Sequence, residues 1–229
     1  MKKMIFLTAM LTLVFCVSQA QMVYLQGGVS LANITKDNDG NTESNNTLTT
    51  FNAGVMARFG LSKVIDLETG LLFTGRGSRA ESKFNGGADY VRSTFRPYYL
   101  ELPLNLVVQA PLGKSGIFFN AGPYVAMGVG GKSKIESKIG PLSSSSESDI
   151  KFSNDDPFTS QQDDAAYDKL KRFDYGINLG AGIKVSRLML KANYGFGLAK
   201  INSTESNNSA NDKNKYRTLS FSVGIPLGL

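Results

Sequence analysis

The sequence contains a small set of charged and aromatic side chains whose types could support chemistry. Glu68 and Glu101, with Asp66 near the first of them, could form a pair of carboxylates for acid–base work. The same carboxylates could instead belong to a buried ionic network, because buried charges are normally paired. We favour the network, and the residues that we expect in it are Arg58, Glu68, Tyr99, Glu101, Lys184 and Lys191.

The absence of histidine excludes several kinds of active site. The sequence has no His and one Cys, which is Cys16. A Ser/His/Asp triad and a histidine-containing metal site are therefore excluded. Because the residue that most often acts as a general base near neutral pH is missing, we expect no catalysis, no metal and no cofactor.

An acidic segment, residues 37–43, is similar in composition to a calcium-binding loop. It departs from the EF-hand pattern, since Gly40 comes too early and the twelfth position is Leu48 rather than Glu. Further acids lie within residues 129–172: Glu147, Asp149, Asp155, Asp156, Asp163, Asp164 and Asp168. Weak binding of divalent ions is the alternative to a solvated loop, and we expect the solvated loop.

The elements that must position these residues follow from alternation of apolar and polar side chains. In residues 98–108, leucines at even positions alternate with Glu101, Pro103 and Asn105, a period that is typical of strands with one apolar face. Eight segments show it: residues 23–34, 50–60, 64–75, 95–109, 116–128, 173–185, 188–200 and 216–227. Pro103 and Pro123 lie inside two of these segments and indicate bulges, which leaves ten strands as an alternative to eight.

The connections between the segments alternate in length. Those at residues 35–49, 76–94, 129–172 and 201–215 are long and polar, whereas those at 61–63, 110–115 and 186–187 are tight. A transmembrane barrel has short periplasmic turns and long outer loops. We therefore predict an all-β fold, an eight-stranded antiparallel up-and-down transmembrane β-barrel. Within residues 129–172 we expect a hairpin that pairs residues 134–139 with residues 148–153.

The two faces of each strand predict what surrounds the barrel and what fills it. Leu, Val, Ile and Phe would face lipid, while glycines and polar residues would face a lumen that eight strands leave just wide enough for side chains. A lumen filled in this way forms no open pore. Two alternatives remain: a small passive channel with an unfilled lumen, and a soluble lipocalin-like binder whose apolar faces would line an internal cavity.

Aromatic residues concentrate near one end of the predicted strands. Those near the outer ends are Phe51, Phe73, Tyr98, Phe173, Tyr175, Phe196 and Tyr216, whereas Phe59 and Phe119 lie near the inner ends. Aromatic rings at the level of the lipid headgroups are typical of membrane barrels. The pattern therefore predicts a well-populated outer belt of rings.

The N-terminus has the pattern of a secretory signal peptide. Lys2 and Lys3 precede an uncharged stretch, and Ser18 and Ala20 are small residues at the positions that signal peptidase reads. The stretch is too short to span a bilayer. We expect cleavage that leaves a barrel domain of residues 21–229 after a signal peptide of residues 1–20. Cys16 would be removed, so disulfides and thiol chemistry are not expected.

Two segments resemble a known family. The strand RPYYLELPL, residues 96–104, followed by AGPY, residues 121–124, is similar to the outer-membrane-protein β-barrel family of Bacteroidetes, also called PorT-like or porin-like. The residues that carry the resemblance are Tyr98, Tyr99, Glu101, Pro103, Gly122, Pro123 and Tyr124. It implies a location in the cell outer membrane. Some relatives are linked to type IX secretion, and no residue here singles out that role.

These features together predict a monomeric outer-membrane protein with a structural or surface-interaction role. The expected partners are outer-membrane lipid and lipopolysaccharide, the barrel-assembly machinery, and an unknown surface partner that contacts the outer loops. Lys and Arg outnumber Asp and Glu by 25 to 19, and the excess forms no basic cluster. We therefore expect no nucleic-acid binding.

Overall fold

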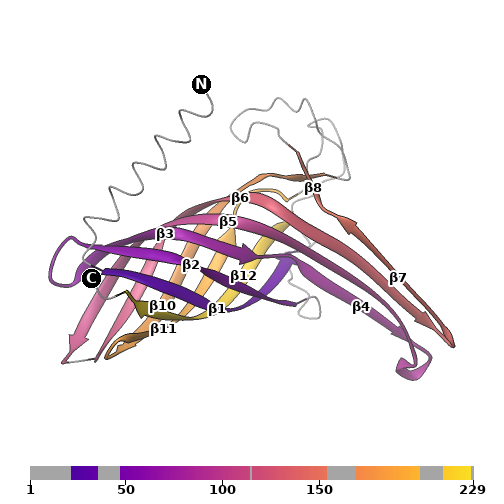
Figure 1. Cartoon of the computed structure of the whole chain (residues 1–229), viewed down its shortest axis with the longest axis horizontal. Helices are drawn as coiled ribbons and strands as arrows, with labels where there is room; N and C mark the ends of the chain where they lie inside the picture. Colours follow the sequence, from indigo (N-terminus) through magenta and orange to yellow (C-terminus); the bar gives the residue numbers. More distant parts are fainter. Residues whose placement is uncertain (1–21, 36–46, 114, 154–168, 202–213, 228–229) are drawn as a thin grey trace.

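Eight antiparallel strands close into a barrel (Figure 1) in the computed structural model, which describes residues 22–35, 47–113, 115–153, 169–201 and 214–227. The barrel strands are β1 (Met22–Thr35), β2 (Leu48–Gly60), β3 (Ile65–Gly75), β5 (Asp89–Leu112), β6 (Ser115–Ile139), β10 (Phe173–Val185), β11 (Leu188–Gly197) and β12 (Lys215–Pro226). Each strand pairs with its sequence neighbour, and β1 also pairs with β12. The ring of hydrogen bonds therefore has no free edge.

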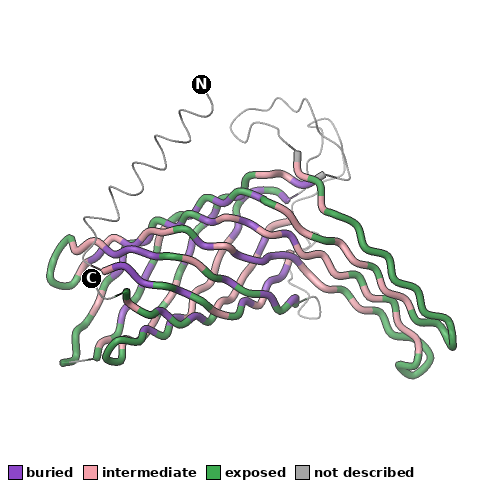
Figure 2. The backbone as a smooth tube through the Cα atoms, in the orientation of Figure 1, coloured by how far each residue is buried: buried purple, intermediate pink, exposed green. Residues whose placement is uncertain are grey.

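The alternation read from the sequence decides which face of each strand points outward. Along β5, Leu102, Leu104 and Leu106 are exposed, while Glu101 and Asn105 at alternate positions are buried in the lumen. The same alternation of buried and exposed positions runs around the barrel (Figure 2). An exterior made of exposed Leu, Val, Ile and Phe matches hydrocarbon and not water. The predicted eight-stranded transmembrane barrel is confirmed.

Neither proline interrupts the barrel. Pro103 lies opposite Tyr124, and the β5–β6 register continues without a shift past both Pro103 and Pro123. The one register shift between these strands lies at Tyr98 and Tyr99, further toward the end that carries the long connections. The bulges expected at the prolines are therefore absent, and the ring has eight strands rather than ten.

Two of the expected outer loops are largely strand. β5 and β6 are 24 and 25 residues long and leave the barrel as a pair. β4 (Ser78–Phe84) and β7 (Leu142–Asp149) pair with their outer edges. We call the resulting four-stranded sheet, made of β4, residues 89–96, residues 132–139 and β7, the arm; it projects from one end of the barrel (Figure 1). That end is called the outer end below.

The predicted hairpin in residues 129–172 exists with a different register. Lys134 pairs with Glu147 and Ile139 with Leu142, so β7 ends where the expected partner strand would begin. The reason is a tight turn at Gly140, whose φ of 58° is a left-handed conformation that glycine adopts at no steric cost. The remaining strands, β8 (Lys151–Ser153) and β9 (Lys169–Lys171), form a short parallel pair, and η2 (Asn85–Gly87) links β4 to β5.

The arm begins at a kink between β3 and β4. The pairing with β5 keeps one register from Gly75 opposite Tyr98 to Ser78 opposite Phe95. Between them, Gly77 has φ 121°, and a Cβ there would lie 1.8 Å from the Phe95 carbonyl oxygen. Only glycine fits this close approach, so Gly77 sets the direction in which the arm leaves the barrel.

The outer aromatic belt is present, with one exception. Phe51, Phe73 and Tyr98 form a cluster on the outside of the barrel, with ring centroids 5.4–6.1 Å apart. Phe173 and Tyr175 are exposed as well. Tyr216 was expected in this belt but is 2% exposed. Along β12 the odd-numbered Phe221 and Val223 face outward, so Tyr216 points into the lumen. Among the described residues, no helix is long and apolar enough to span a membrane.

Candidate functional site

The inner part of the lumen is organised around one carboxylate. Glu68, on β3, is 0% exposed and accepts hydrogen bonds from Tyr24 Oη at 2.8 Å, Arg58 Nε at 2.8 Å, Asn105 Nδ2 at 3.1 Å and Lys191 Nζ at 2.6 Å. These donors come from four different strands, β1, β2, β5 and β11. Two cations and one anion make a net charge of +1, and we call these five residues the inner cluster.

Arg58 is held by aromatic faces as well as by Glu68. Its guanidinium carbon lies 4.4 Å from the Phe118 ring centroid and 5.7 Å from that of Tyr24. Cation–π contacts of this kind are strongest where water is excluded. They partly offset the free-energy cost of burying the Nη2 atom of Arg58, which has no hydrogen-bond partner.

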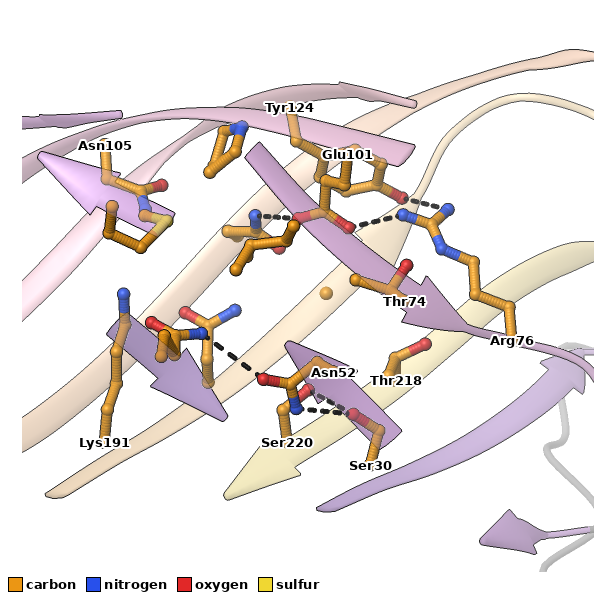
Figure 3. Close-up of a pocket in the computed structure, with 17 residues that line it drawn as sticks. Ser30, Asn52, Thr74, Arg76, Glu101, Asn105, Tyr124, Lys191, Thr218 and Ser220 are labelled. Carbon is orange, nitrogen blue, oxygen red and sulfur yellow. Dashed lines mark hydrogen bonds and ion pairs between the residues drawn. The ribbon is translucent and has the colours of Figure 1, made fainter. Parts of the chain in front are cut away.

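The outer part of the lumen is organised around one arginine. Arg76 Nη2 donates to Glu101 Oε2 at 2.7 Å, and Nη1 donates to Asp174 and, at 3.4 Å, to Tyr124 Oη. Figure 3 shows the guanidinium beside Glu101 and Tyr124. Its carbon also lies 4.8–5.6 Å from the ring centroids of Tyr124, Tyr99 and Tyr216. One cation and two anions make a net charge of −1, and these six residues are the outer cluster.

The two clusters carry opposite net charges. The +1 of the inner cluster and the −1 of the outer cluster cancel, so the lumen is neutral over these groups although each ion is buried. Charges in a low-dielectric interior are costly unless paired and hydrogen-bonded. The arrangement fits the expected ionic network better than a carboxylate pair, because Glu68 and Glu101 belong to different clusters with different counter-ions.

A belt of amides and hydroxyls separates the clusters. Asn52 Nδ2 donates to Ser30 Oγ at 2.9 Å, and Ser222 Oγ donates to Asn52 Oδ1 at 2.9 Å (Figure 3 shows Asn52 and Ser30). Here the lumen has a cavity of about 50 Å³. A water needs roughly 10–15 Å³, so a few waters fit. Small-molecule pockets are much larger, on the order of 300–1,000 Å³.

Five of the six residues expected in the lumen network are buried there. Arg58, Glu68 and Lys191 meet in the inner cluster, and Tyr99 and Glu101 belong to the outer cluster. Lys184 differs: it is half-buried at the inner end of β10, makes no ion pair among the described residues, and interacts with Asp66 only at longer range.

Arg76 and Asp174 were missed by reasoning from the sequence. The alternation predicts a third strand that ends at Gly75, which assigns Arg76 to an outer loop, and it does not single out Asp174. Both residues continue the inward parity of their strands, since Arg76, one residue beyond the end of β3, is buried like Thr74, and Asp174 alternates with exposed Phe173 and Tyr175 on β10. The alternation of inward-facing and outward-facing side chains is therefore the signal by which the sequence could have identified both residues.

Three of the seven residues that carry the family resemblance belong to the outer cluster. Tyr99, Glu101 and Tyr124 contribute side chains to it, while Pro103 pairs with Tyr124 across the β5–β6 ladder. A Cβ on Gly122 would lie 2.0 Å from the Leu104 carbonyl oxygen. Pro123 is exposed on the outer face of the barrel, and Tyr98 is half-buried on the same face in its ring cluster.

The outer mouth is covered by apolar side chains from the chain segments that flank the arm. Ile150, Phe152, Leu170 and Ile201, which we call the outer cap, pack against Tyr99 and Tyr216. Backbone bonds hold the cap, since Gly128 N donates to Arg172 O at 2.6 Å and Ile150 N to Gly131 O at 3.0 Å. Phe152 meets Tyr99 edge-on, with ring centroids 5.8 Å apart. The cap therefore shields the outer cluster from water.

The Gly128→Val variant is expected to displace the cap and to lower the free energy of unfolding by about 1–3 kcal/mol. A Cβ at position 128 would lie 2.1 Å from Cε1 of Phe152. The measurements are urea unfolding in lipid vesicles and the rate of tryptic cleavage after Lys171, which should rise. Gly130→Val is the matched control, because a Cβ there meets no atom within 4 Å. Equal effects of both variants would contradict the packing role of Gly128.

The acidic segment at residues 37–43 lies outside the described residues, as do Asp155, Asp156, Asp163, Asp164 and Asp168. In the part of the chain that the structure describes, no group of three or more His, Cys, Asp or Glu side chains is arranged to hold a metal ion. Glu147 and Asp149 lie on β7 of the arm rather than in a loop.

Comparisons with known proteins find one matching family and solved structures of low similarity. The profile of the family described as outer membrane protein beta-barrel domain matches residues 19–203. The structure of Ail, the attachment invasion locus protein of Yersinia pestis, bound to the heparin analogue sucrose octasulfate, is 14% identical and covers 90% of this chain and 97% of Ail, with a TM-score of 0.39. Neisserial surface protein A is 10% identical with the same coverages and a TM-score of 0.43. No curated protein gives a significant match.

Similarities at that level carry no information on ligand or role. The family match is of a different kind, because it spans most of a chain whose described strands close into a barrel with an apolar exterior. The protein therefore belongs to the family of outer membrane protein beta-barrel domains and resides in the outer membrane.

Proposed function

We propose that this protein is a sealed, non-catalytic membrane anchor that holds the arm rigidly at the cell surface for contact with a partner. The observation that carries the proposal is the length of β5 and β6, which are 24 and 25 residues. A tilted strand crosses the membrane in about 9–11 residues. The excess is paired into a four-stranded sheet, and a rigid element loses less conformational entropy on binding than a loop does.

The arm has the features of a contact surface. β4 and β7 leave their outer edges unpaired among the described residues, so their backbone groups are available to a partner strand. One face is rich in serine and carries the exposed apolar residues Val91, Ile135, Ile139 and Leu142. Scattered apolar residues on a polar sheet are common at transient interfaces.

The state of the lumen supports an anchor over an enzyme or a channel. The ions of the two clusters pair with one another, and among the described residues neither cluster leaves a base that faces a pocket of substrate size. The outer cap covers the mouth. A passive channel would require displacement of both clusters and of the cap, which we do not expect under resting conditions.

The proposal also covers the branch of the family to which the chain belongs and its route to the outer membrane. The segments at residues 96–104 and 121–124 support the PorT-like branch of Bacteroidetes. Export by cleavage after Ala20, insertion by the barrel-assembly machinery, contact with lipopolysaccharide and a monomeric state follow from that placement and from the closed ring of strands.

Labelling of single cysteines on intact cells tests the proposal. The Ser144→Cys variant, on exposed β7, is expected to react with a membrane-impermeant maleimide in intact cells. Arg187→Cys, in the tight turn between β10 and β11, is expected to react only after the outer membrane is permeabilised. The unsubstituted chain is the control, since its one cysteine, Cys16, lies in the predicted signal peptide.

The same variants test whether the arm contacts a specific partner at the cell surface. A benzophenone maleimide attached to the Ser144→Cys variant is expected to give one adduct of discrete mass upon illumination of intact cells. The same reagent at position 187, attached in permeabilised cells, should give no adduct of that mass. Reversed labelling would refute the orientation, and a featureless smear from position 144 would refute a specific surface partner.

A further inference from the structure

The arm has two chemically different faces. Cross-strand partners share a face, and the pairs Arg79 with Thr94, Arg92 with Glu136, Arg96 with Lys132 and Lys134 with Glu147 define one of them. This charged face holds all seven cations of the arm, namely Arg79, Lys83, Arg92, Arg96, Lys132, Lys134 and Lys138. It holds four acids, Glu81, Glu136, Glu147 and Asp149, so its net charge is +3.

Most of these cations are engaged by acids on the same face. Glu81 binds Arg92 at 3.1 Å and Arg79 at 3.2 Å, Glu136 binds Lys134 at 2.8 Å, and Glu147 binds Lys132. The hydrogen bond from Arg92 lowers the pKa of Glu81, and that from Lys132 lowers the pKa of Glu147. These carboxylates therefore stay ionised at neutral pH and offset part of the positive charge of this face.

Arg96 and Lys138 are the exceptions, since neither makes an ion pair with any residue that the structure describes. Lys138 is exposed, whereas the Nε atom of Arg96 is buried without a hydrogen-bond partner. A buried guanidinium N–H without a partner is costly, and an external anion beside Arg96 would satisfy it. Its cross-strand partner Lys132 is paired with Glu147, but the Lys132 side chain is 61% exposed, so its ammonium can also donate to an anion beside Arg96.

The position of Arg96 indicates where that anion comes from. Arg96 and Lys132 line a cavity of about 420 Å³ at the foot of the arm, together with Thr49 and Tyr98. The lining has five cations and two carboxylates, and its other charged members are Arg79, Arg92, Lys134, Glu136 and Glu147. Tyr98 is also a member of the exterior ring cluster with Phe51 and Phe73. The cavity thus begins where the apolar belt of the barrel ends, which is the level of the lipid headgroups.

We propose that this cavity binds the phosphate-bearing headgroup of an outer-leaflet lipid, with the phosphate on Arg96 and Lys132 and the acyl chains along Phe51, Phe73 and Tyr98. A guanidinium offers two parallel N–H donors that match a phosphate. A free anion would use the cations but would have no use for the apolar wall beneath them. The site is independent of the partner proposed for the arm, and the cysteine-labelling results would be unaffected by its failure.

Native mass spectrometry of the refolded chain tests the site with a defined probe. The chain is mixed with equal amounts of bisphosphorylated lipid A and its dephosphorylated form carrying the same acyl chains. We expect a preference of roughly tenfold or more for the phosphorylated lipid. Arg96→Gln/Lys132→Gln should lose that preference. Lys83→Gln/Lys138→Gln, which removes two cations from the tip of the same face, should keep it.

Three results would overturn the proposal: equal retention of both lipids by the unsubstituted chain, an unchanged preference in Arg96→Gln/Lys132→Gln, or an equal loss in the tip variant. Displacement of the lipid by millimolar inorganic phosphate would assign the site to a free anion instead. The heat-modifiable gel band verifies that each variant is folded. Arg96→Lys, which keeps the charge and loses the paired donors, should retain an intermediate preference.

Discussion

Replacing Arg76 with methionine is expected to lower the free energy of unfolding by about 3–5 kcal/mol, the usual effect of breaking a buried ion pair from one side. Arg76 is the cation of the outer cluster, and its side chain is 4% exposed. Its removal leaves Glu101 and Asp174 as two buried anions with no counter-ion in the cluster, and the net charge of the cluster becomes −2 instead of −1. The three tyrosine rings around the guanidinium would lose their cation–π contacts as well.

The free energy of unfolding is measured by urea titration of the chain in lipid vesicles. The folded fraction is read from the gel band whose mobility changes on heating. Arg79→Met is the control, because that side chain is 42% exposed on the arm and its ion pair with Glu81 contributes little. Arg76→Met/Glu101→Gln/Asp174→Asn should recover most of the loss, since no buried charge is left unpaired. If Arg76→Met is as stable as Arg79→Met, the outer cluster does not stabilise the barrel.

The part of the fold that follows from local alternation could be predicted. A period of two residues separates the two faces of each strand, so the burial of Arg58, Glu68 and Glu101 follows once the strands are recognised. The same parity extended by one residue beyond Gly75 would have placed Arg76 in the lumen. The polar character of residues 76–94 hid this, because a membrane strand is recognised by its lipid-facing residues and the arm has none.

The grouping of the lumen residues could not be predicted. Which side chains come level with one another across a barrel depends on strand tilt and stagger, and these are properties of the closed ring. Glu68 and Lys191 are 123 residues apart in the sequence, and nothing local to either residue specifies their contact. Hence the inward charges were recognised as one set, while their division into an inner and an outer cluster required the structure.

The arm was hidden for a related reason. Ser143, Ser144, Ser145 and Ser146 have low strand propensity and suggest a loop. They form β7 because the preceding turn at Gly140 presents them to the edge of β6, which the barrel already holds in an extended conformation. Tertiary context therefore decides the structure of this segment, as is common for strands at the edge of a sheet.

Glu68→Gln is expected to destabilise the barrel more than Glu101→Gln, although both substitutions remove one buried carboxylate. Glu68 is the only anion of the inner cluster, so its loss leaves Arg58 and Lys191 as like charges and raises the net charge of the cluster from +1 to +2. Glu101 shares Arg76 with Asp174, and its loss brings the outer cluster from −1 to zero. We expect a loss of about 3–5 kcal/mol for Glu68→Gln and about 1–3 kcal/mol for Glu101→Gln.

The same urea assay tests the order of the two variants, and the order is a sharper criterion than either magnitude. Adding Lys191→Met to Glu68→Gln should restore part of the lost stability, because it returns the inner cluster to a net charge of +1. Adding Lys191→Met to Glu101→Gln should lower stability further, since Glu68 then loses one of its two cations. Opposite signs for one substitution in two backgrounds would show that Lys191 acts through its own contact with Glu68 and not through the net charge of the whole lumen. Equal effects of Lys191→Met in both backgrounds would mean that the lumen behaves as one network.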